Sequence, residues 1–353
     1  MQSCCNNTKF IYICQIMSLK KATRRQFIKT GSLAATAVCL PVTLLTQSIF
    51  KTMKDNTYEV IIIGGSYSGL SAGMALGRAS RTILILDTGK PCNIQTPHSH
   101  NFLTQDGETP AAIAEKAKEQ VLKYPSITFK NDKVIKAVKT AEGFEITTES
   151  GKNYSAQKLL FASGVRDIMP NIEGFSSCWG ISVIHCPYCH GYEVKGQKTA
   201  LMANGDIAYH MGQMLMQWTK DLTLFTNGKS TLTQEQHEKF KKHNIKIIET
   251  EISSLQHEKG YLQSVTLKNG DVHPFKAMYA KIPIEQHSSL PTELGCTLTE
   301  QGFIVVDEFK KTSVPGIYAS GDCITPARAV VTAVEGGTKA AVSINNEMCM
   351  AAF

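Results

Sequence analysis

Acidic residues are absent from the first fifty positions of the chain, and the chain as a whole holds no low-complexity segment. Its composition, 42% hydrophobic and 19% charged, is that of a globular protein and excludes a disordered one. Six of the seven net positive charges come from residues 1–50, so the remaining residues are nearly neutral. A nearly neutral body offers no basic face for a polyanion, which excludes a nucleic-acid partner.

The basic N-terminal segment is typical of an export signal rather than of a folded domain. Residues 23–29 read Thr-Arg-Arg-Gln-Phe-Ile-Lys and match the twin-arginine pattern, and an uncharged, moderately apolar stretch follows over residues 30–50. Twin-arginine export carries folded proteins, which suits a chain that loads a cofactor before it crosses the membrane. We therefore expect residues 1–56 to be a leader, with Met17 as the better start.

The leader predicts a periplasmic location, either free or attached to the membrane. No Ala-x-Ala cleavage site follows the apolar stretch, which is long enough to stay as a membrane anchor. If the arginine pair is instead a chance feature before an apolar helix, the expected location is the cytoplasm.

Eleven cysteines cannot all pair, because their number is odd. Four lie in the leader, and among the other seven only Cys186 and Cys189 are close enough in sequence to form a local pair. The rest are expected to be mostly buried small hydrophobic residues, while a second disulfide stays open in an oxidising compartment. They are Cys92, Cys178, Cys296, Cys323 and Cys349.

From residue 58 the pattern is that of a nucleotide-binding βαβ unit. Residues 58–63 are a nearly continuous apolar run, as a buried parallel strand requires. Residues 64–69 are the turn, residues 70–79 have a helical pattern, and residues 82–86 form a second strand that ends at Asp87. At 353 residues the chain has room for two domains, and a second unit of similar pattern begins at residue 198.

Later segments alternate between strands and turns. Residues 143–152 read as a hairpin, residues 158–164 as a buried strand that ends at Gly164, and residues 222–225 as a strand of the second unit. The strand that ends at Gly321 and Asp322 is followed by an apolar helix that extends to about Met348.

The turn of the first unit reads Gly64-x-Ser66-x-x-Gly69, with Asp87 eighteen residues further on. The first glycine permits the tight turn, the last lets helix and strand pack closely, and a pyrophosphate binds at the exposed amides of the helix start. Asp87 is placed to accept hydrogen bonds from a ribose hydroxyl. Ser66 is small enough to let the backbone approach a phosphate. The alternative is a glycine-rich turn that binds no nucleotide.

Three motifs in order carry a resemblance to a known family. They are the Gly64–Gly69 turn, the Ala-Ser-Gly strand end at Gly164, and the Gly-Asp strand end at Asp322, with Cys186-Pro-Tyr-Cys189 between the last two. From residue 58 onward the chain resembles the FAD-containing low-molecular-weight thioredoxin reductases. The resemblance implies homodimers and an FAD held by Gly64, Ser66, Tyr67, Ser68, Gly69, Asp87, Asn101, Gly164, Gly321, Asp322, Arg328 and Ala329.

Cys186 and Cys189 have the spacing of a redox-active pair, because a dithiol separated by two residues can take up or give up two electrons as a disulfide. The resemblance implies that Cys189 is the sulfur nearer the flavin and Cys186 the one that exchanges with substrate. The alternatives are an inert buried pair and a zinc half-site with His185 and His190. Because a structural zinc site normally has a second pair at similar spacing, we expect no metal.

His190 departs from the thioredoxin reductase pattern, in which an acidic residue follows the second cysteine. The run Cys-x-x-Cys-His-Gly-Tyr-Glu, which ends at Glu193, is more similar to the dithiol oxidases of the superfamily. Histidine titrates near neutral pH and can remove a proton from an attacking thiol. The other interpretation is that His190 hydrogen-bonds the loop.

The second dinucleotide motif is degraded, which makes NADPH a doubtful cofactor. Ala203 stands where the family has the first glycine of the turn, and Lys229 follows the next strand where the family has arginines for the 2′-phosphate. A single lysine binds phosphate less well than a bidentate guanidinium cluster. We expect this domain to be a scaffold for the cysteines.

The sequence thus predicts an α/β fold of two dinucleotide-binding, three-layer domains. Residues 57–170 and 289–353 form the FAD domain, and residues 171–288 form an inserted NAD(P)-fold domain. The expected function is FAD-dependent oxidation of a dithiol, of a protein or a small molecule, with oxygen or another acceptor. The alternatives are a thioredoxin reductase-type enzyme that uses NAD(P)H and a non-catalytic flavin redox sensor.

Overall fold

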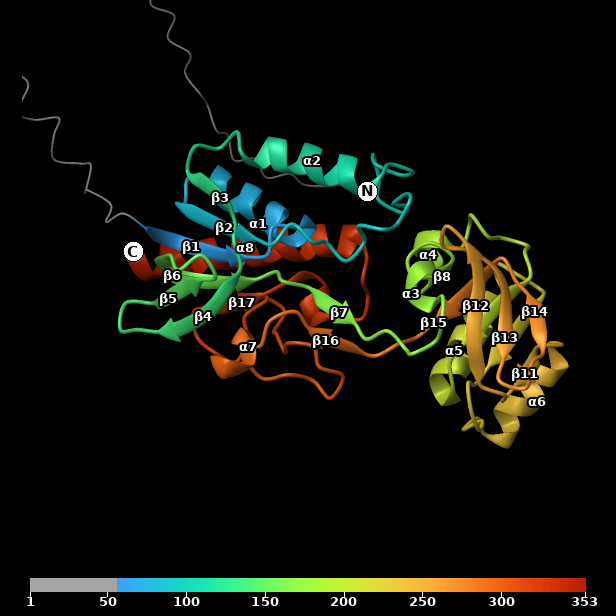
Figure 1. The fold of residues 1–353 in the computed structure, drawn as a ribbon. Helices are drawn as coiled ribbons and strands as arrows, with labels where there is room; N and C mark the ends of the chain where they lie inside the picture. Colours follow the sequence, from blue (N-terminus) through green and yellow to red (C-terminus); the bar gives the residue numbers. More distant parts are fainter. Residues whose placement is uncertain (1–55) are drawn as a thin grey trace, which may run out of the picture. The chain divides into compact units, whose positions relative to one another are not determined.

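The computed structural model describes residues 56–353, so the predicted leader, start site, export signal and membrane anchor lie outside the described residues. Within the described part of the chain no helix is long and apolar enough to cross a membrane. Residues 54–353 form one compact unit, and it contains two mainly parallel sheets (Figure 1).

The first sheet is centred on β1 (Thr57–Ile63), which is buried on both faces. Val60 and Ile62 pack with helices on one face, and Ile61 and Ile63 pack on the other, which explains the unbroken apolar run. The strand order is β3-β2-β1-β6-β5-β4, with β17 paired to β6. The other strands are β2 (Ile83–Asp87), β3 (Ile127–Asn131), β4 (Val134–Lys139), β5 (Phe144–Thr148), β6 (Asn153–Phe161) and β17 (Ile317–Ala319).

This sheet is the middle of three layers (Figure 1). One face is covered by α1 (Tyr67–Arg78), α2 (Pro110–Val121) and α8 (Val330–Ala352). The other face packs against the β4–β5 hairpin and against the segment of α7 (Leu290–Glu293). The carboxyl ends of the parallel strands therefore remain at an edge that the covering layers leave open.

The second sheet repeats this arrangement in the order β11-β10-β9-β15-β8. Helices α5 (Gly205–Leu215) and α6 (Gln234–Lys242) pack on one face, and an antiparallel sheet of β12, β13 and β14 packs on the other. The strands are β8 (Val183–Ile184), β9 (Thr199–Met202), β10 (Leu222–Phe225), β11 (Lys246–Ile248), β12 (Ile252–Glu258), β13 (Tyr261–Leu267), β14 (Val272–Pro274) and β15 (Ala277–Ala280).

A two-stranded antiparallel sheet connects the two parallel sheets along the chain. It consists of β7 (Val165–Asp167) and β16 (Ile284–Gln286), by which the chain leaves the first sheet and returns to it. The remaining elements are α3 (Phe175–Cys178), α4 (Pro187–His190) and the 3-10 helix η2 (Gly321–Ile324). The α/β fold of two three-layer domains is confirmed, while the domain boundaries at residues 170 and 288 stay predictions.

The structure corrects several predicted element bounds. Helix α1 begins at Tyr67 rather than at residue 70, because Ser66 already has the extended backbone of an N-cap. Gly69 thus lies in the first helical turn, where a Cβ atom would meet the Gly64 carbonyl oxygen at 1.8 Å. Strand β6 begins at Asn153, five residues earlier than predicted, because it pairs with both β1 and β5.

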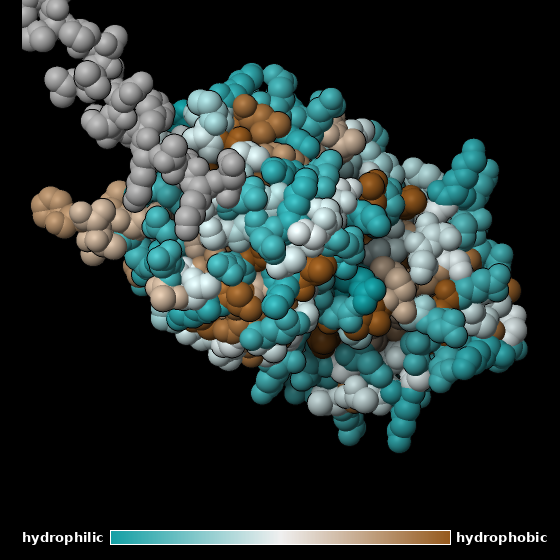
Figure 2. Space-filling view, turned by 60° about the vertical axis from the view of Figure 1, so that its left-hand side comes forward, coloured by the Kyte–Doolittle hydropathy of each residue, from teal (hydrophilic) through white to brown (hydrophobic). Residues whose placement is uncertain are grey.

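The five free cysteines of the described part are mostly buried, as expected. Cys178, Cys296 and Cys323 are buried, whereas Cys92 and Cys349 are exposed. Apolar surface on the face shown in Figure 2 is interrupted by hydrophilic side chains.

Candidate active site

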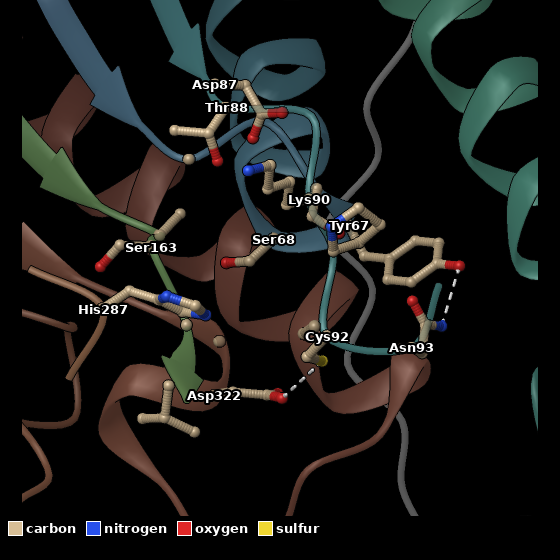
Figure 3. A pocket seen from close by; sticks show the side chains of 18 of the residues that line it. Tyr67, Ser68, Asp87, Thr88, Lys90, Cys92, Asn93, Ser163, His287 and Asp322 are labelled. Atoms are coloured by element: carbon tan, nitrogen blue, oxygen red, sulfur yellow. Dashed lines mark hydrogen bonds between the residues drawn. The ribbon is translucent and has the colours of Figure 1, made fainter. Parts of the chain in front are cut away.

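A cavity of about 1160 Å³ lies at the carboxyl ends of the first sheet's parallel strands. Ligands of open α/β sheets bind at this edge. Ten of the twelve residues predicted to hold FAD line it, and Figure 3 labels Tyr67, Ser68, Asp87 and Asp322 among them around the same space. The ten are Gly64, Ser66, Tyr67, Ser68, Asp87, Gly164, Gly321, Asp322, Arg328 and Ala329.

The other two predicted residues lie elsewhere. Gly69 is packed beneath the turn, where its lack of a side chain allows α1 to approach Gly64. Asn101 has a positive φ of 59° and lines a separate small hollow near Cys189. Its backbone amide donates to Asp106 Oδ1 at 2.7 Å.

The start of α1 is open toward this cavity. Its N-cap, Ser66, makes no side-chain capping hydrogen bond, so the first amides of the helix are available to an anion. Gly64 adopts φ +108°, and a Cβ atom there would meet the Ala162 carbonyl oxygen at 2.2 Å. Asp87 holds the turn, because its two carboxylate oxygens accept from the Gly65 and Gly89 amides, both at 2.6 Å. Each oxygen keeps a second lone pair for a ribose hydroxyl.

Three buried polar atoms in the cavity wall have no hydrogen-bond partner among the described residues. They are Ser163 Oγ, His185 Nε2 and Gln286 Oε1. Gln286 is held in place because its amide nitrogen donates to the Gly302 and Cys323 carbonyls at 2.7 and 2.9 Å. Unpaired buried polar atoms cost stability, and the flavin ring offers both a donor and acceptors. The cavity residues therefore fit FAD, with its pyrophosphate at the α1 start.

A buried ionic network forms another part of the cavity wall. Arg328 binds Asp167 through two hydrogen bonds of 2.6 and 3.1 Å and Asp322 through one of 3.2 Å. Trp179 donates to the same Asp167 carboxylate at 3.1 Å. Burial acts to raise the pKa of Asp167, but the Arg328 guanidinium outweighs it and holds the pKa below its usual value. Asp167 is therefore ionised at neutral pH.

Burial has the larger effect on the pKa values of the neighbouring groups, Asp322 and Cys92. It raises the pKa of Asp322 despite Arg328, and it raises the pKa of the Cys92 thiol to about 11. Cys92 is accessible through the open cavity and lies 3.7 Å from Asp322 Oδ2 (Figure 3). At this pKa Cys92 is a neutral thiol, so it differs chemically from the cysteine pair.

Cys186 and Cys189 form a disulfide at the start of α4. Cys189 and His190 line the large cavity and Cys186 does not. The Cys189 amide donates to Cys186 Sγ at 3.2 Å, a contact that favours negative charge on that sulfur. Among the described residues no group of three or more His, Cys, Asp or Glu side chains is placed to hold a metal ion.

His190 is poised to act as a base. Burial lowers its pKa, and the charge of Glu193 only partly opposes this effect, so the ring is neutral at pH 7. The His190 ring makes no hydrogen bond to another described side chain or to the loop. The His100 ring approaches it edge-on, with 6.4 Å between the two ring centroids. Burial also lowers the pKa of His185, to about 4.

The corresponding turn of the second sheet is closed by its own side chains. The Asn204 side-chain oxygen accepts from the Gly205 amide at 2.9 Å and from the Thr231 amide at 2.8 Å. The Asn204 amide nitrogen donates to the Lys229 carbonyl at 2.9 Å. Gln236 reaches from α6 to Asp206 in the first turn of α5 at 2.7 Å. One amide of the helix start that would receive a second dinucleotide, that of Gly205, is therefore capped by a side chain.

Sequence reasoning missed Asp167, Trp179, His100 and Gln286. Each is a single polar or aromatic residue outside any motif, and it reaches the site only through the fold. Only His100 has a local signal in the sequence, because it belongs to the pair His98-x-His100 just before Asn101, which was predicted to contact the flavin.

Comparison with known proteins supplies independent information. Residues 58–337 match the family described as pyridine nucleotide-disulphide oxidoreductase. The chain is 31% identical over 307 residues to thioredoxin reductase sirT of Leptosphaeria maculans, which covers 82% of this chain and 93% of that protein. It is 25% identical over 304 residues to thioredoxin reductase of Bacillus subtilis, with coverages of 83% and 95%. The crystal structure of an oxidoreductase from Agrobacterium tumefaciens has a TM-score of 0.78 and 34% identity, and the match covers 83% of this chain and 99% of that one.

Proposed function

Since the chain belongs to the pyridine nucleotide-disulphide oxidoreductase family and is an FAD-dependent, thioredoxin reductase-like oxidoreductase acting on sulfur groups, we propose that it oxidises a substrate dithiol through the Cys186–Cys189 disulfide. The predicted family resemblance and the FAD cofactor are confirmed by the same comparisons. The direction of electron flow, the substrate and the acceptor belong to the proposal.

The contrast between the starts of α1 and α5 supports electron flow from a dithiol to the flavin. At α1 the N-cap makes no side-chain hydrogen bond and faces the large cavity. At α5 the Asn204 side chain occupies the amides of Gly205 and Thr231. A pyridine nucleotide would have to displace these hydrogen bonds without an arginine cluster for its 2′-phosphate. Electrons therefore enter more easily from a thiol than from NADPH.

The chemistry assigns a role to each residue near the disulfide. His190, neutral at pH 7, takes the proton of an incoming thiol, and the thiolate attacks the disulfide. The mixed disulfide that forms is then attacked at its substrate sulfur by the second substrate thiol, which releases the enzyme cysteine, so the substrate loses two electrons and Cys186 and Cys189 gain them. FAD held in the large cavity would supply the acceptor for these two electrons and the route by which they reach oxygen, which would give peroxide, or another acceptor. The Asp167–Arg328 pair keeps the adjoining wall rigid.

A thioredoxin reductase-type reaction fed by NAD(P)H is the second candidate. The similarity to proteins named thioredoxin reductase favours it, and the second sheet keeps the parallel order of a dinucleotide-binding domain. A non-catalytic redox sensor is the third, and low turnover with every thiol and disulfide would favour it. The proposal also includes export to the periplasm and a homodimer, which follow from the leader and from the family resemblance.

Anaerobic mixing with dithiothreitol, NADPH or NADH separates these functions. The proposal predicts fast flavin bleaching by dithiothreitol, slow bleaching by both nucleotides, and recovery of the yellow colour with peroxide when oxygen is admitted. The variant Asn204→Gly, which frees the two amides, should be reduced faster by NADPH than the wild type and equally fast by dithiothreitol. Rapid NADPH reduction of the wild type would instead establish the reductase.

A further inference from the structure

A second, smaller hollow of about 290 Å³ adjoins the disulfide. His100 and Cys189 line both this hollow and the large cavity, so these two residues lie between the two spaces. The other residues that line the hollow are Asn101, Asp106, Tyr188, Tyr192 and Glu193. A molecule in this hollow reaches Cys189 without entering the space that fits FAD, whereas Cys186, the sulfur expected to exchange with substrate, lines neither space.

The lining of the hollow is acidic. Asp106 and Glu193 contribute carboxylates, and none of the lysines and arginines among residues 56–353 lines it. His100 lies between the two, with Nδ1 3.6 Å from Asp106 Oδ1 and Nε2 3.5 Å from Glu193 Oε1. Lys195 lies 5.9 Å from the centre of the Tyr192 ring but does not line the hollow. The lining is therefore net negative whether His100 is neutral or protonated.

Two tyrosines give the hollow an aromatic surface. Tyr188 is 65% exposed and Tyr192 is 77% exposed. The Tyr188 ring is supported edge-on by Trp218 at 5.4 Å between centroids. Aromatic rings pack well against uncharged carbon skeletons and attract cations. The volume is at the lower end of the range for small-molecule pockets.

We propose that this hollow is the substrate subsite and that it selects small dithiols that are uncharged or cationic, while it disfavours anionic thiols. The inference rests on the proposed function, because a dithiol must be the reductant. In each turnover one substrate thiolate attacks the Cys186–Cys189 disulfide at Cys189, which lines the hollow, so that a mixed disulfide forms and the Cys186 thiolate leaves. The second substrate thiol then attacks the substrate sulfur of the mixed disulfide and displaces Cys189. The substrate leaves as a disulfide, its two electrons remain on the cysteine pair for FAD, and oxygen is the final acceptor. The anionic substrate is slower because its carboxylate approaches Asp106 and Glu193.

Dihydrolipoamide and dihydrolipoate provide the test, because they carry the same two thiols and differ in one carboxylate. With the FAD-loaded protein under anaerobic conditions, we expect the second-order rate constant of flavin bleaching to be at least tenfold larger for the amide at low salt. The ratio should fall toward one in about 1 M salt, where the screening length drops to about 3 Å. This comparison needs no variant.

The double variant Glu193→Gln with Asp106→Asn removes both charges from the lining, while both new side chains keep an acceptor oxygen. It should reduce the ratio of the bleaching rate constants, dihydrolipoamide over dihydrolipoate, to less than about threefold. The control Glu142→Gln removes an exposed carboxylate that lines neither space and should leave the ratio unchanged. Equal wild-type rates for the two dithiols, or faster bleaching by reduced thioredoxin than by dihydrolipoamide, would overturn the inference and leave the dithiol oxidase standing. Failure of every dithiol to bleach the flavin would overturn the proposed function itself.

Discussion

Replacing His190 by alanine should slow dithiol-driven flavin reduction by an amount that depends on pH. A free thiol has a pKa near 8.5, so about 3% of it is thiolate at pH 7. A base that delivers the thiolate therefore raises the rate by up to about thirtyfold, and help in the transition state extends this to about a hundredfold. At pH 9.5 about nine-tenths of the thiol is already ionised, and the loss should shrink to a few-fold.

The acid side of the profile reflects the burial of His190. Burial lowers its pKa, although Glu193 acts in the opposite direction. A ring with a lowered pKa stays neutral, and can accept a proton, at pH values where an exposed histidine is already charged. The advantage of the wild type over His190→Ala should therefore persist below pH 6.5 and disappear only when His190 becomes protonated.

Stopped-flow measurement of flavin absorbance, with dithiothreitol under anaerobic conditions from pH 5.5 to 9.5, gives the ratio of the two rate constants. The matched control is His210→Ala in α5, since His210 is exposed and lines neither space. Added imidazole should restore part of the rate of His190→Ala. A ratio that stays constant across this range would show that His190 only supports the loop, and would refute its role as a base.

Three further predictions concern other parts of the chain. Cys186→Ser should abolish dithiol-driven bleaching while the protein keeps its FAD, as absorbance spectra would show. Asp167→Asn leaves Arg328 with one carboxylate fewer and should lower the free energy of unfolding by about 3–5 kcal/mol in urea titrations. The pKa of Asp167 in the folded state lies below its unfolded-state value of about 3.9. The wild type should therefore lose this stabilisation as the pH falls from about 3.9 through the lower folded-state pKa, while the stability of the variant changes less over the same range. Changing Arg24 and Arg25 to lysine should retain the protein in the cytoplasm of its host, and fractionation like the wild type would disprove the export signal.

The fold was largely predictable because its signals are local. Strands β1 and β2 and the turn between β1 and α1 follow from short apolar runs and glycine positions, and β10 begins and ends where the sequence predicts. The start of α1 was misplaced by three residues, since the sequence does not reveal whether a small residue such as Gly69 lies in a turn or packs inside a helix.

The site was predictable only where a motif or the family resemblance supplies the residue. Arg328 was expected at the flavin and lines the cavity, but its partner Asp167 comes from the end of a three-residue strand with no recognisable spacing. Trp179 and Gln286 likewise reach the cavity through tertiary structure. Pairings between residues this far apart in sequence cannot be inferred from a single chain.

The degraded second motif bears on the direction of electron flow, and the sequence and the structure each reveal a part of it. The sequence reveals that Ala203 replaces a glycine and that only Lys229 follows the next strand. Neither fact excludes weak NADPH binding. The structure adds that the Asn204 side chain caps the Gly205 amide at the α5 start and donates to the Lys229 carbonyl, so the same side chain ties the helix start to the loop after the next strand. At α1, by contrast, the first amides have no side-chain cap and remain available to an anion. This difference between two helix starts of one architecture is the structural basis of the proposal that a thiol, rather than a pyridine nucleotide, supplies the electrons.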